Sequence, residues 1–373
     1  MTGSGPLSGL LVADFSRVLA GPLAAMTLGD LGAAVVKVER PAVGDDTRGW
    51  GPPFAADGRA TYFLSVNRNK RSLAIDLSTV EGQAAALELA LEADILVENF
   101  PPGTMERFGL GYEQLNSSRL IYASVTGFGR ESQMPGYDFL IQAVGGLMSI
   151  TGPADGEPTK VGVALVDVLA GQQLTSGILA ALYSRERTGR GQRVEVSLLG
   201  SLLAGLVNQA SGLLNAGVIP GRMGNRHPSL SPYETLRAQD GAFAVAVGNQ
   251  AQFERFCGAL GLDEARSDAR FRDNAGRVAH REVLLAAIEE VTLRQPAQYW
   301  IDALSAAKVP CGPVNDLAQA FALAERLGLD PVVQLGDAKT VASPIRLSET
   351  PVTYRLPPPK LPRSSESRSS EPT

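Results

Sequence analysis

The first half of this chain alternates short apolar runs with helical patterns, and that alternation constrains the fold more than any other feature. Runs typical of buried strands lie at Leu10–Phe15, Val35–Glu39, Ser72–Asp76, Asp94–Glu98 and Leu120–Val125. One intervening helix opens at Pro22 and is closed by Gly32, and a later one starts at a capping box, Ser78–Glu81. Alternation of this kind predicts an α/β fold, in which helices cover both faces of a parallel sheet.

The second half is organised differently. Residues 161–214 are strongly apolar, with long helical stretches around a short strand at Val194–Ser197, as expected of a core or a subunit interface. Residues 216–232 are rich in Gly, Pro, Asn and Ser and read as a linker or mobile loop. Two further strands, Tyr233–Leu236 and Ala242–Val247, flank Asp240-Gly241, a hairpin signal. The Pro-rich and then Ser/Glu-rich tail, residues 356–373, is expected to be disordered.

Composition excludes several classes of protein. The net charge of −5 comes with mixed signs throughout, so there is no basic stripe of the kind that nucleic-acid binders use. The two cysteines stand in no metal-ligand spacing, and the chain has neither a signal-peptide pattern nor an uninterrupted apolar run long enough to span a membrane. We therefore expect a soluble, cytoplasmic protein. With only two histidines, a multi-His metal site is excluded and a Ser-His-Asp arrangement has little room.

The turn after the first strand reads Ser16–Pro22 and contains no glycine-rich dinucleotide fingerprint. Its small residues would still let a nucleotide-containing ligand approach a helix N-terminus, and a plain tight turn is an equal alternative. Cationic residues cluster after the second strand at Lys37 and Arg40, before the third at Arg68–Arg71, and after the fourth at Arg107. Each alone reads as a solvated surface charge, but together they indicate an anionic ligand with phosphates.

Asp167 lies inside an apolar run, Val163–Gly171, where no solvated charge is expected. One interpretation is the N-cap of a buried helix. The other is a nucleophilic carboxylate, which needs no partner base because an ordinary pKa of about 3.9 leaves it ionised at neutral pH. The residues alone leave both interpretations open.

Several segments, in order along the chain, resemble the class III CoA-transferases, the carnitine and bile-acid-inducible family. They are Arg17–Pro22, Lys37–Pro41, Gly44–Arg48, Val66–Ser72, Val97–Phe100, Thr188–Gln192 and Val309–Val314. The resemblance runs from about residue 6 to 355. Within the family the chain is most similar to the succinyl-CoA:glutarate type, through Gly44–Arg48, Trp50–Phe54, Val66–Lys70 and Ser231–Tyr233.

This resemblance implies a Rossmann-like large domain built from both ends of the chain, with a smaller α+β domain inserted, and an interlocked homodimer. The expected boundaries are 1–215 for the first part of the large domain, 216–232 for a linker or lid loop, 233–308 for the small domain, 309–355 for the return to the large domain, and 356–373 for the tail. Within the linker, Gly221–Ser231 is the candidate lid, with Gly224 as its hinge.

The resemblance also implies a chemistry. Asp167 matches the family's nucleophile, which attacks an acyl-CoA thioester so that CoA passes to a carboxylic acid through aspartyl anhydride and aspartyl-CoA intermediates. Coenzyme A is then a substrate and product, and no metal is required. Contacts to CoA are expected at Leu19, Ala20, Arg40, Ile75, Asp76, Asn99, Phe100, Arg107, Tyr137 and Asp138. Arg48 or Arg68 is expected to bind the acceptor's distal carboxylate, unless it forms a structural ion pair with Asp45 or Asp46.

Two alternatives stay open on the sequence. An α-methylacyl-CoA racemase would share the fold, but the matching segment Gly136-Tyr137-Asp138 has tyrosine where such racemases have a catalytic histidine. A non-catalytic CoA-binding protein is the second alternative, and it predicts that Asp167 is dispensable.

Overall fold

The computed structural model describes residues 5–362 and divides the chain into two compact units. Unit 1 contains the residues up to Leu147, then Val161–Val218, and the chain from Leu329 onwards. Unit 2 contains Met148–Lys160 and Ile219–Gly328. Unit 1 is thus built from three segments of the chain, and the two segments of unit 2 lie between them in the sequence.

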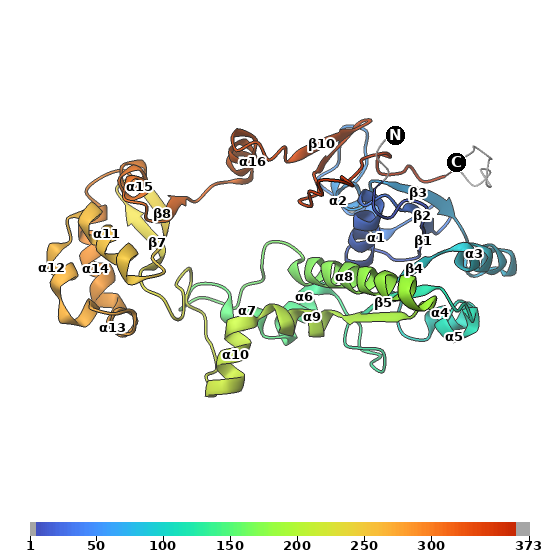
Figure 1. The fold of residues 1–373 in the computed structure, drawn as a ribbon, viewed down its shortest axis with the longest axis horizontal. Coiled ribbons are helices and arrows are strands. Elements are labelled where there is room, and N and C mark those ends of the chain that lie inside the picture. The colour runs from blue at the N-terminus through green and yellow to red at the C-terminus, as the bar shows by residue number, and fades with distance from the viewer. Residues whose placement is uncertain (1–4, 363–373) are drawn as a thin grey trace. The chain divides into compact units, whose positions relative to one another are not determined.

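A six-stranded parallel sheet forms the centre of unit 1 (Figure 1), which confirms the expected α/β fold. Its strands are β1 (Leu11–Asp14), β2 (Ala34–Glu39), β3 (Lys70–Ala74), β4 (Ile95–Glu98), β5 (Ile121–Thr126) and β6 (Arg193–Ser197). Their spatial order, β3-β2-β1-β4-β5-β6, is that of doubly wound nucleotide-binding folds, and the direction of winding reverses between β1 and β4.

Helices cover both faces of this sheet, as the alternation predicts. One apolar core joins the sheet to α1 (Ala20–Asp30), α6 (Asp138–Val144), α8 (Leu165–Thr188) and α9 (Leu198–Gly205). The core on the other face involves α3 (Val80–Glu92), α4 (Thr104–Arg107) and α5 (Tyr112–Leu115). Unit 1 also contains η1 (Asp46–Gly49), α2 (Thr61–Ser65) and α10 (Val207–Ala216), while α7 (Leu147–Ile150) lies where the two units divide.

Two expected boundaries need correction. The third strand occupies Lys70–Ala74 rather than Ser72–Asp76, because Lys70 is buried in an ion pair with Asp14 that the local sequence does not reveal. The N-cap of α3 is Thr79, whose hydroxyl accepts a hydrogen bond from the N–H of Gly82, so the helix starts one residue later than a Ser78 cap would place it.

Within residues 5–362, α8 is the one helix long and apolar enough to pass a length and composition test for a membrane span. Ten of its residues are buried, and they include the charged Asp167 and Arg185. The core helix of a water-soluble protein passes the same test, and α8 packs against α1 and against strands β5 and β6 in the main apolar core. We therefore describe α8 as a core helix.

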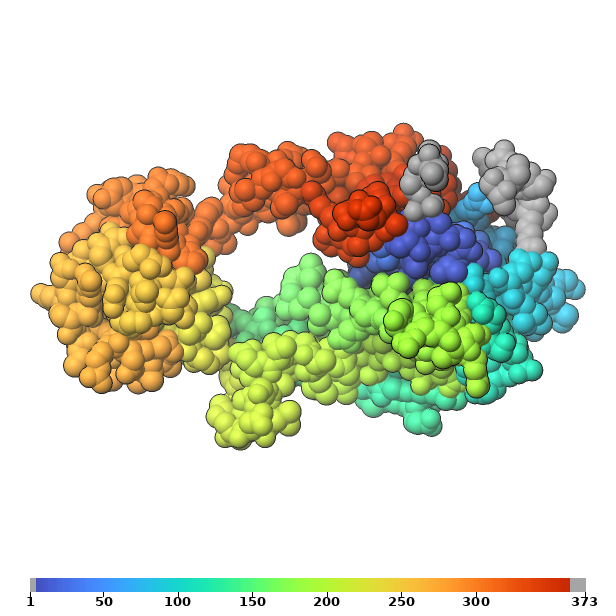
Figure 2. Space-filling view, in the orientation of Figure 1, coloured from blue at the N-terminus to red at the C-terminus, as the bar shows by residue number. Residues whose placement is uncertain are grey.

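The chain from Leu329 onwards closes unit 1. It forms the hairpin of β10 (Val332–Leu335) and β11 (Ala338–Val341) and then runs along the end of α1. There the N–H of Thr353 donates to the carbonyl of Asp30 at 2.8 Å, and the Arg355 guanidinium donates to the carbonyl of Ala33 at 2.6 Å. Figure 2 shows this red segment against the dark blue start of the chain.

The first residues of the expected disordered tail are held in the same way. The N–H of Asn69 donates to the carbonyl of Leu356 at 2.9 Å, and the Arg48 guanidinium donates to the carbonyl of Pro359 at 3.1 Å. Residues 363–373 of that predicted tail lie outside the described residues.

Unit 2 is built on a small antiparallel sheet of β7 (Tyr233–Ala238), β8 (Gly241–Ala246) and β9 (Cys311–Pro313). Asp240 lies in the turn between β7 and β8, as the hairpin signal predicts. The remaining elements are α11 (Gln250–Leu260), α12 (Asp263–Ser267), η2 (Ala269–Phe271), α13 (Asn274–Ala279), α14 (Arg281–Thr292), α15 (Ala297–Ala306) and α16 (Leu317–Arg326).

The candidate lid, Gly221–Ser231, lies in unit 2 and is hydrogen-bonded to the other segment of that unit. The N–H of Gly224 donates to the carbonyl of Gly152 at 3.0 Å, and the Arg222 guanidinium donates to the carbonyl of Gly156 at 2.8 Å. Gly224 has a φ of 60°, a left-handed conformation that glycine adopts readily. Its role as a hinge stays a prediction.

Candidate active site

A cavity of about 350 Å³ lies in unit 1 at the carboxyl ends of β1 and β4, and we call it the Asp167 cavity. Its walls come from the turn after β1 (Arg17, Val18, Leu19, Ala20), the segment after β4 (Asn99, Phe100, Pro101, Pro102), the loop after β5, and Asp167. Ligands of open parallel sheets bind where the strand order reverses, which is the place of this cavity.

Asp167 lies in the first turn of α8, but it is not the N-cap. The capping position is Ala164, which has no side chain for the purpose. Instead Asp138, on α6, accepts hydrogen bonds from the N–H groups of Val166 at 2.8 Å and Asp167 at 3.3 Å. Because a distant carboxylate satisfies these N–H groups, the Asp167 side chain is left free. It makes no hydrogen bond or ion pair with any described residue.

Burial controls the ionisation of Asp167. The residue is 9% exposed, and burial, together with the negative charge of Asp138, raises its pKa from 3.8 to about 7. This corrects the expectation of an ordinary pKa: near neutral pH about half of the carboxylate is ionised. A buried, unpaired carboxyl group that borders a cavity is the arrangement expected of a nucleophile or a general base.

Asn99 holds the turn that forms one wall of the cavity. Its side-chain oxygen accepts from the N–H of Arg17 at 2.8 Å, and its side-chain nitrogen donates to the carbonyl of the same residue at 2.7 Å. The next residue, Val18, has a φ of 68° and donates its N–H to Asp45 at 3.3 Å. A β-branched residue in this conformation is strained, so the amide of Asn99 and the carboxylate of Asp45 stabilise the turn.

A second cavity of about 180 Å³, the Arg40 cavity, is lined by Arg40, Ile75, Asp76 and Phe100, among others. It shares Arg17 and Phe100 with the Asp167 cavity, and the guanidinium of Arg17 lies 4.6 Å from the centre of the Phe100 ring. Arg40 is half exposed and forms an ion pair with Asp46. Together the two cavities could hold an elongated ligand with an anionic end.

The structure brings most of the expected CoA-contacting residues to these two cavities. Leu19, Ala20, Asn99, Phe100 and Tyr137 line the Asp167 cavity, and Arg40, Ile75 and Asp76 line the Arg40 cavity. Two expected residues line neither. Arg107 donates a hydrogen bond to the hydroxyl of Thr104 at 3.0 Å, and Asp138 caps α8.

Arg48 and Arg68 are both in ion pairs, although not with the partners that the sequence suggested. Two nitrogens of Arg48 donate to the two carboxylate oxygens of Glu39, each at 2.7 Å. Arg68 is 3% exposed and donates to both oxygens of Asp30, at 2.9 and 2.5 Å. Neither guanidinium is therefore free to receive an acceptor carboxylate in this arrangement.

Sequence reasoning missed Tyr62, on α2. Burial and the negative charges of Asp167, Asp138 and Asp45 raise its pKa to about 12, so the phenol stays protonated and can donate a hydrogen bond. Trp50 packs edge-on against its ring, with centroids 5.3 Å apart. No motif marks Tyr62 in the sequence, since its relation to Asp167 arises from tertiary structure alone.

Among the described residues there is no group of three or more His, Cys, Asp or Glu side chains that could hold a metal ion. The groups available at the cavities are carboxyl, guanidinium, phenol and backbone groups. A carboxylate at this position can attack an activated acyl carbon and leave again unchanged, which is the chemistry of group transfer.

Comparison with known proteins agrees with this chemistry. The family model described as CoA-transferase family III matches residues 7–364. A succinate–glutarate CoA-transferase of Agrobacterium fabrum is 42% identical over 95% of this chain and 93% of its own length. An acetyl-CoA:oxalate CoA-transferase of Acetobacter aceti is 40% identical over 92% of this chain and 90% of its own.

A solved structure supports the same relationship. The crystal structure of a CAIB/BAIF family protein from Brucella suis superimposes with a TM-score of 0.86 at 42% identity, over 96% of this chain and 97% of that one. The family match spans nearly the whole chain and includes both cavities. The chain belongs to family III of the CoA-transferases, enzymes that move CoA between an acyl-CoA and a carboxylate.

Proposed function

We propose that this enzyme transfers CoA from succinyl-CoA or a similar acyl-CoA to a dicarboxylic acid, with Asp167 as the nucleophile. The observation that carries the proposal is the Asp167 carboxylate, which is buried, unpaired and at the edge of a cavity. The racemase alternative gains no support, because Tyr137, which stands where such racemases have a catalytic histidine, is 64% exposed and is held beside no partner base in the described part of the chain.

The proposed reaction has four steps and no redox change. A carboxylate oxygen of Asp167 attacks the thioester carbonyl, the C–S bond breaks, and a mixed anhydride and CoA thiolate result. The thiolate attacks the aspartyl carbonyl of this anhydride and releases the donor acid. The acceptor carboxylate then attacks the carbonyl of the aspartyl-CoA thioester, the C–S bond breaks, and a second anhydride and free CoA thiolate result. The thiolate finally attacks the acceptor's carbonyl, which gives the new acyl-CoA and restores the Asp167 carboxylate.

The environment of Asp167 suits these intermediates. Anhydrides hydrolyse, so a site that is largely closed to water favours transfer over hydrolysis. Tyr62, protonated and electrostatically coupled to Asp167, is a candidate donor to the oxygen that develops negative charge. Asp138 acts through the backbone by fixing the first turn of α8, so we assign it a positioning role rather than the CoA contact that the resemblance implied.

We place CoA along both cavities. The nucleotide end would contact Arg40, Ile75 and Asp76, and the pantetheine end would reach Asp167 past Leu19, Ala20, Asn99, Phe100 and Tyr137. Arg107, which is also expected to contact CoA, would have to leave Thr104 to reach it.

A dicarboxylic acceptor is supported by the names of two relatives, which act on succinate and glutarate or on oxalate. A second carboxylate on the acceptor needs a cationic partner. Arg48 and Arg68, the residues expected from the sequence, would first have to leave Glu39 and Asp30. Arg17 is the better candidate, because its guanidinium has no hydrogen bond or ion pair with any described residue and lines the Asp167 cavity.

We further propose that the enzyme is a homodimer. Among the described residues, α10 and α16 bury none of their own side chains. Leu214 on α10 is 81% exposed and Leu317 on α16 is 80% exposed. Apolar helix faces of this kind are expected to be covered in solution, and a second copy of the chain is the partner most often used.

The proposal is tested with purified enzyme, succinyl-CoA and a panel of mono- and dicarboxylic acids. The Asp167→Asn variant should lose exchange by roughly a thousand-fold or more, because the amide is not a nucleophile, while CoA affinity changes by less than about threefold. Asp337→Asn, an exposed aspartate in the β10–β11 turn, is the matched control and should be fully active. Full turnover by Asp167→Asn would refute the proposal.

A further inference from the structure

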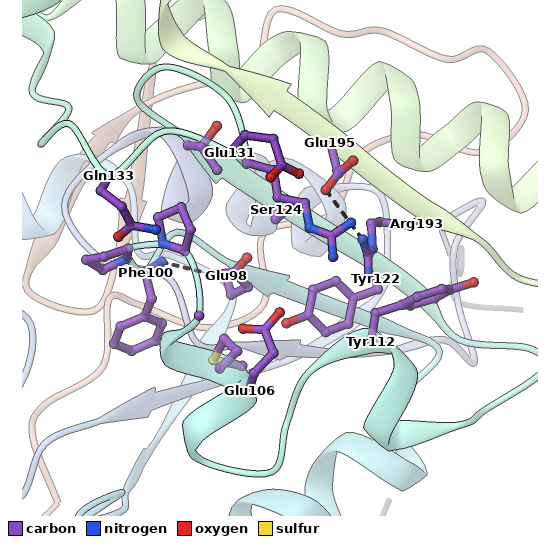
Figure 3. Close-up of a pocket in the computed structure, with 16 residues that line it drawn as sticks. Glu98, Phe100, Glu106, Tyr112, Tyr122, Ser124, Glu131, Gln133, Arg193 and Glu195 are labelled. Atoms are coloured by element: carbon purple, nitrogen blue, oxygen red, sulfur yellow. Dashed lines mark hydrogen bonds and ion pairs between the residues drawn. The ribbon is translucent and has the colours of Figure 1, made fainter.

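A third cavity of unit 1, of about 290 Å³, is not used by the proposed reaction, and we call it the Glu98 cavity. It lies at the ends of β4, β5 and β6, on side chains that include Glu98, Ser124 and Glu195 (Figure 3). The segment Phe100–Pro102 lines both this cavity and the Asp167 cavity. A ligand here would therefore contact a segment that also forms part of the proposed CoA site.

The floor of the cavity consists of three buried polar side chains with free hydrogen-bonding capacity. Tyr122 is 5% exposed, and Ser124 and Glu98 are each 7% exposed. Neither hydroxyl has a hydrogen-bond partner among residues 5–362. One oxygen of Glu98 accepts from the N–H of Phe100 at 2.8 Å, and the other has no partner in the same range. In Figure 3 the phenol of Tyr122 points toward Glu98 and Glu106.

The residues themselves are buried, but their unpaired oxygens border the cavity and are not sealed inside packed protein. A ligand in the cavity can therefore form the hydrogen bonds that the protein leaves unmade. Burial, together with the negative charges of Glu106 and Glu195, raises the pKa of Glu98 to about 8. The floor of the cavity thus offers several acceptor oxygens, and the carboxyl group of Glu98 holds one proton that a bound cation could displace.

The rim adds negative charge. Glu106, Glu131 and Glu195 line the cavity, against the two cations Arg130 and Arg193. Arg193 is already engaged, since its guanidinium lies 3.7 Å from Glu195 and 4.7 Å from the centre of the Tyr112 ring. Acidic groups therefore outnumber free cations around the opening, which attracts a positively charged ligand.

The donor count identifies the class of cation. An ammonium group has three N–H donors and no acceptor, and the floor offers three oxygens, from Glu98, Tyr122 and Ser124. A metal ion is the poorer fit, because the described residues contain no cluster of carboxylates close enough to bind one. The ring of Tyr122, with Tyr112 packed edge-on at 5.8 Å, adds an aromatic wall that cations favour.

We propose that the Glu98 cavity is a binding site for a small organic molecule with a primary ammonium group, held by Glu98, Tyr122 and Ser124. The site is separate from the chemistry at Asp167, and binding requires no transfer of CoA. Its existence can therefore be tested independently of the proposed function.

Isothermal titration calorimetry of the full-length enzyme with n-butylamine at pH 7 is the direct test. We expect saturable binding, and at least about tenfold weaker binding of tetramethylammonium, which has the same charge but no N–H donor. Binding should release about one proton per amine, measured from the dependence of the heat on buffer ionisation enthalpy, because the ammonium ionises Glu98. Above pH 9 the release should disappear, since Glu98 is then already ionised.

Variants locate the site. Glu98→Gln should weaken butylamine binding at least about tenfold and abolish the proton release. Glu254→Gln, an exposed glutamate on α11 in unit 2, is the matched control and should change neither. If Glu98→Gln fails to fold, Tyr122→Phe serves instead and should weaken binding several-fold. Absence of saturable binding up to 10 mM amine (about tenfold above the upper end of typical substrate KM values), or equal affinity in Glu98→Gln, would overturn the proposal.

Discussion

Asp14 and Asp167 are both buried aspartates of unit 1, and they differ in what surrounds them. Asp14, at the end of β1, is fully buried and accepts hydrogen bonds from the ammonium of Lys70 at 2.9 Å and from Ser16. Burial alone would raise the pKa of Asp14, but the charges of Lys70 and Lys37 hold it below its ordinary value. Asp167 has no such partners, and its pKa rises to about 7.

The comparison separates structural from reactive carboxylates. Asp14 belongs to a buried network in which Lys37 also pairs with Asp45 at 2.9 Å, and Asp45 holds the N–H of Val18. This network ties the ends of β1, β2 and β3 together and fixes the turn beside the Asp167 cavity. Removing one partner of a buried ion pair destabilises the fold, whereas an unpaired buried carboxylate at a cavity itself costs stability, and the proposed reaction would account for keeping it.

The largest expected effect is on stability. Asp14→Asn should lower the free energy of unfolding by roughly 3–5 kcal/mol, because Lys70 loses its anionic partner in the core. Asp167→Asn should act in the opposite direction and stabilise the protein at pH 8 by on the order of a few kcal/mol, since it removes a buried unpaired charge. Urea denaturation of both variants at pH 8 measures these changes. Equal destabilisation by the two substitutions would contradict the distinction between a paired Asp14 and an unpaired Asp167.

The effect of Asp167→Asn on folding stability should depend on pH. In the folded state the Asp167 pKa lies above its ordinary value of 3.8, so the folded protein binds the proton more tightly and ionisation costs stability as pH rises from about 4 to 7. The stability gain of Asp167→Asn should therefore grow over that range and stay constant above it. The proposed reaction should depend on pH in the opposite sense, because in that mechanism only the ionised Asp167 carboxylate attacks.

Transferase activity should accordingly rise with pH. We expect kcat/KM for the acyl-CoA to increase about tenfold per pH unit below pH 7 and to level off above it, because the ionised fraction of Asp167 follows its pKa of about 7. Initial rates between pH 5 and 9, at saturating acceptor, measure this. A profile that is flat down to pH 5 would mean that Asp167 is paired or solvated in the working enzyme.

The smallest expected effect comes from Asp138. In Asp138→Asn the side-chain oxygen can still accept from Val166 and Asp167, but the negative charge that raises the Asp167 pKa is gone. The midpoint of the pH profile should move to lower pH by about half a unit. Asp138→Ala is the contrasting variant, because it also removes the cap and should lower kcat at every pH. An unchanged midpoint in Asp138→Asn would exclude electrostatic coupling between the two carboxylates.

Much of this architecture was predictable from local patterns. Sequence patterns predicted all six strands of the parallel sheet, with the third placed two residues too late, and an aspartate in an apolar run identified Asp167 as exceptional. The patterns failed where a charged residue pairs with a partner that is distant in the sequence. Lys70 reads as a surface charge until Asp14 is seen beside it.

The ligand-binding residues were harder to predict for the same reason. Arg68 pairs with Asp30, 38 residues away, and Asp138 caps a helix that begins 27 residues later. Glu98 lies in a segment that the sequence marked only as part of a motif, and its role in a separate cavity follows from burial and from its neighbours on β5. Local sequence gives the elements, while ion pairs and caps between elements decide which charged groups remain free to react.

In the proposed mechanism the Asp167 carboxylate forms a covalent bond first with the acyl group and then with CoA. Incubation with succinyl-CoA, followed by trapping with hydroxylamine or borohydride and peptide mass spectrometry, tests it most directly. We expect a modified Asp167 in the wild-type enzyme and no modification of that peptide in Asp167→Asn. An active enzyme in which Asp167 is never modified, or in which the adduct appears on another residue, would contradict it.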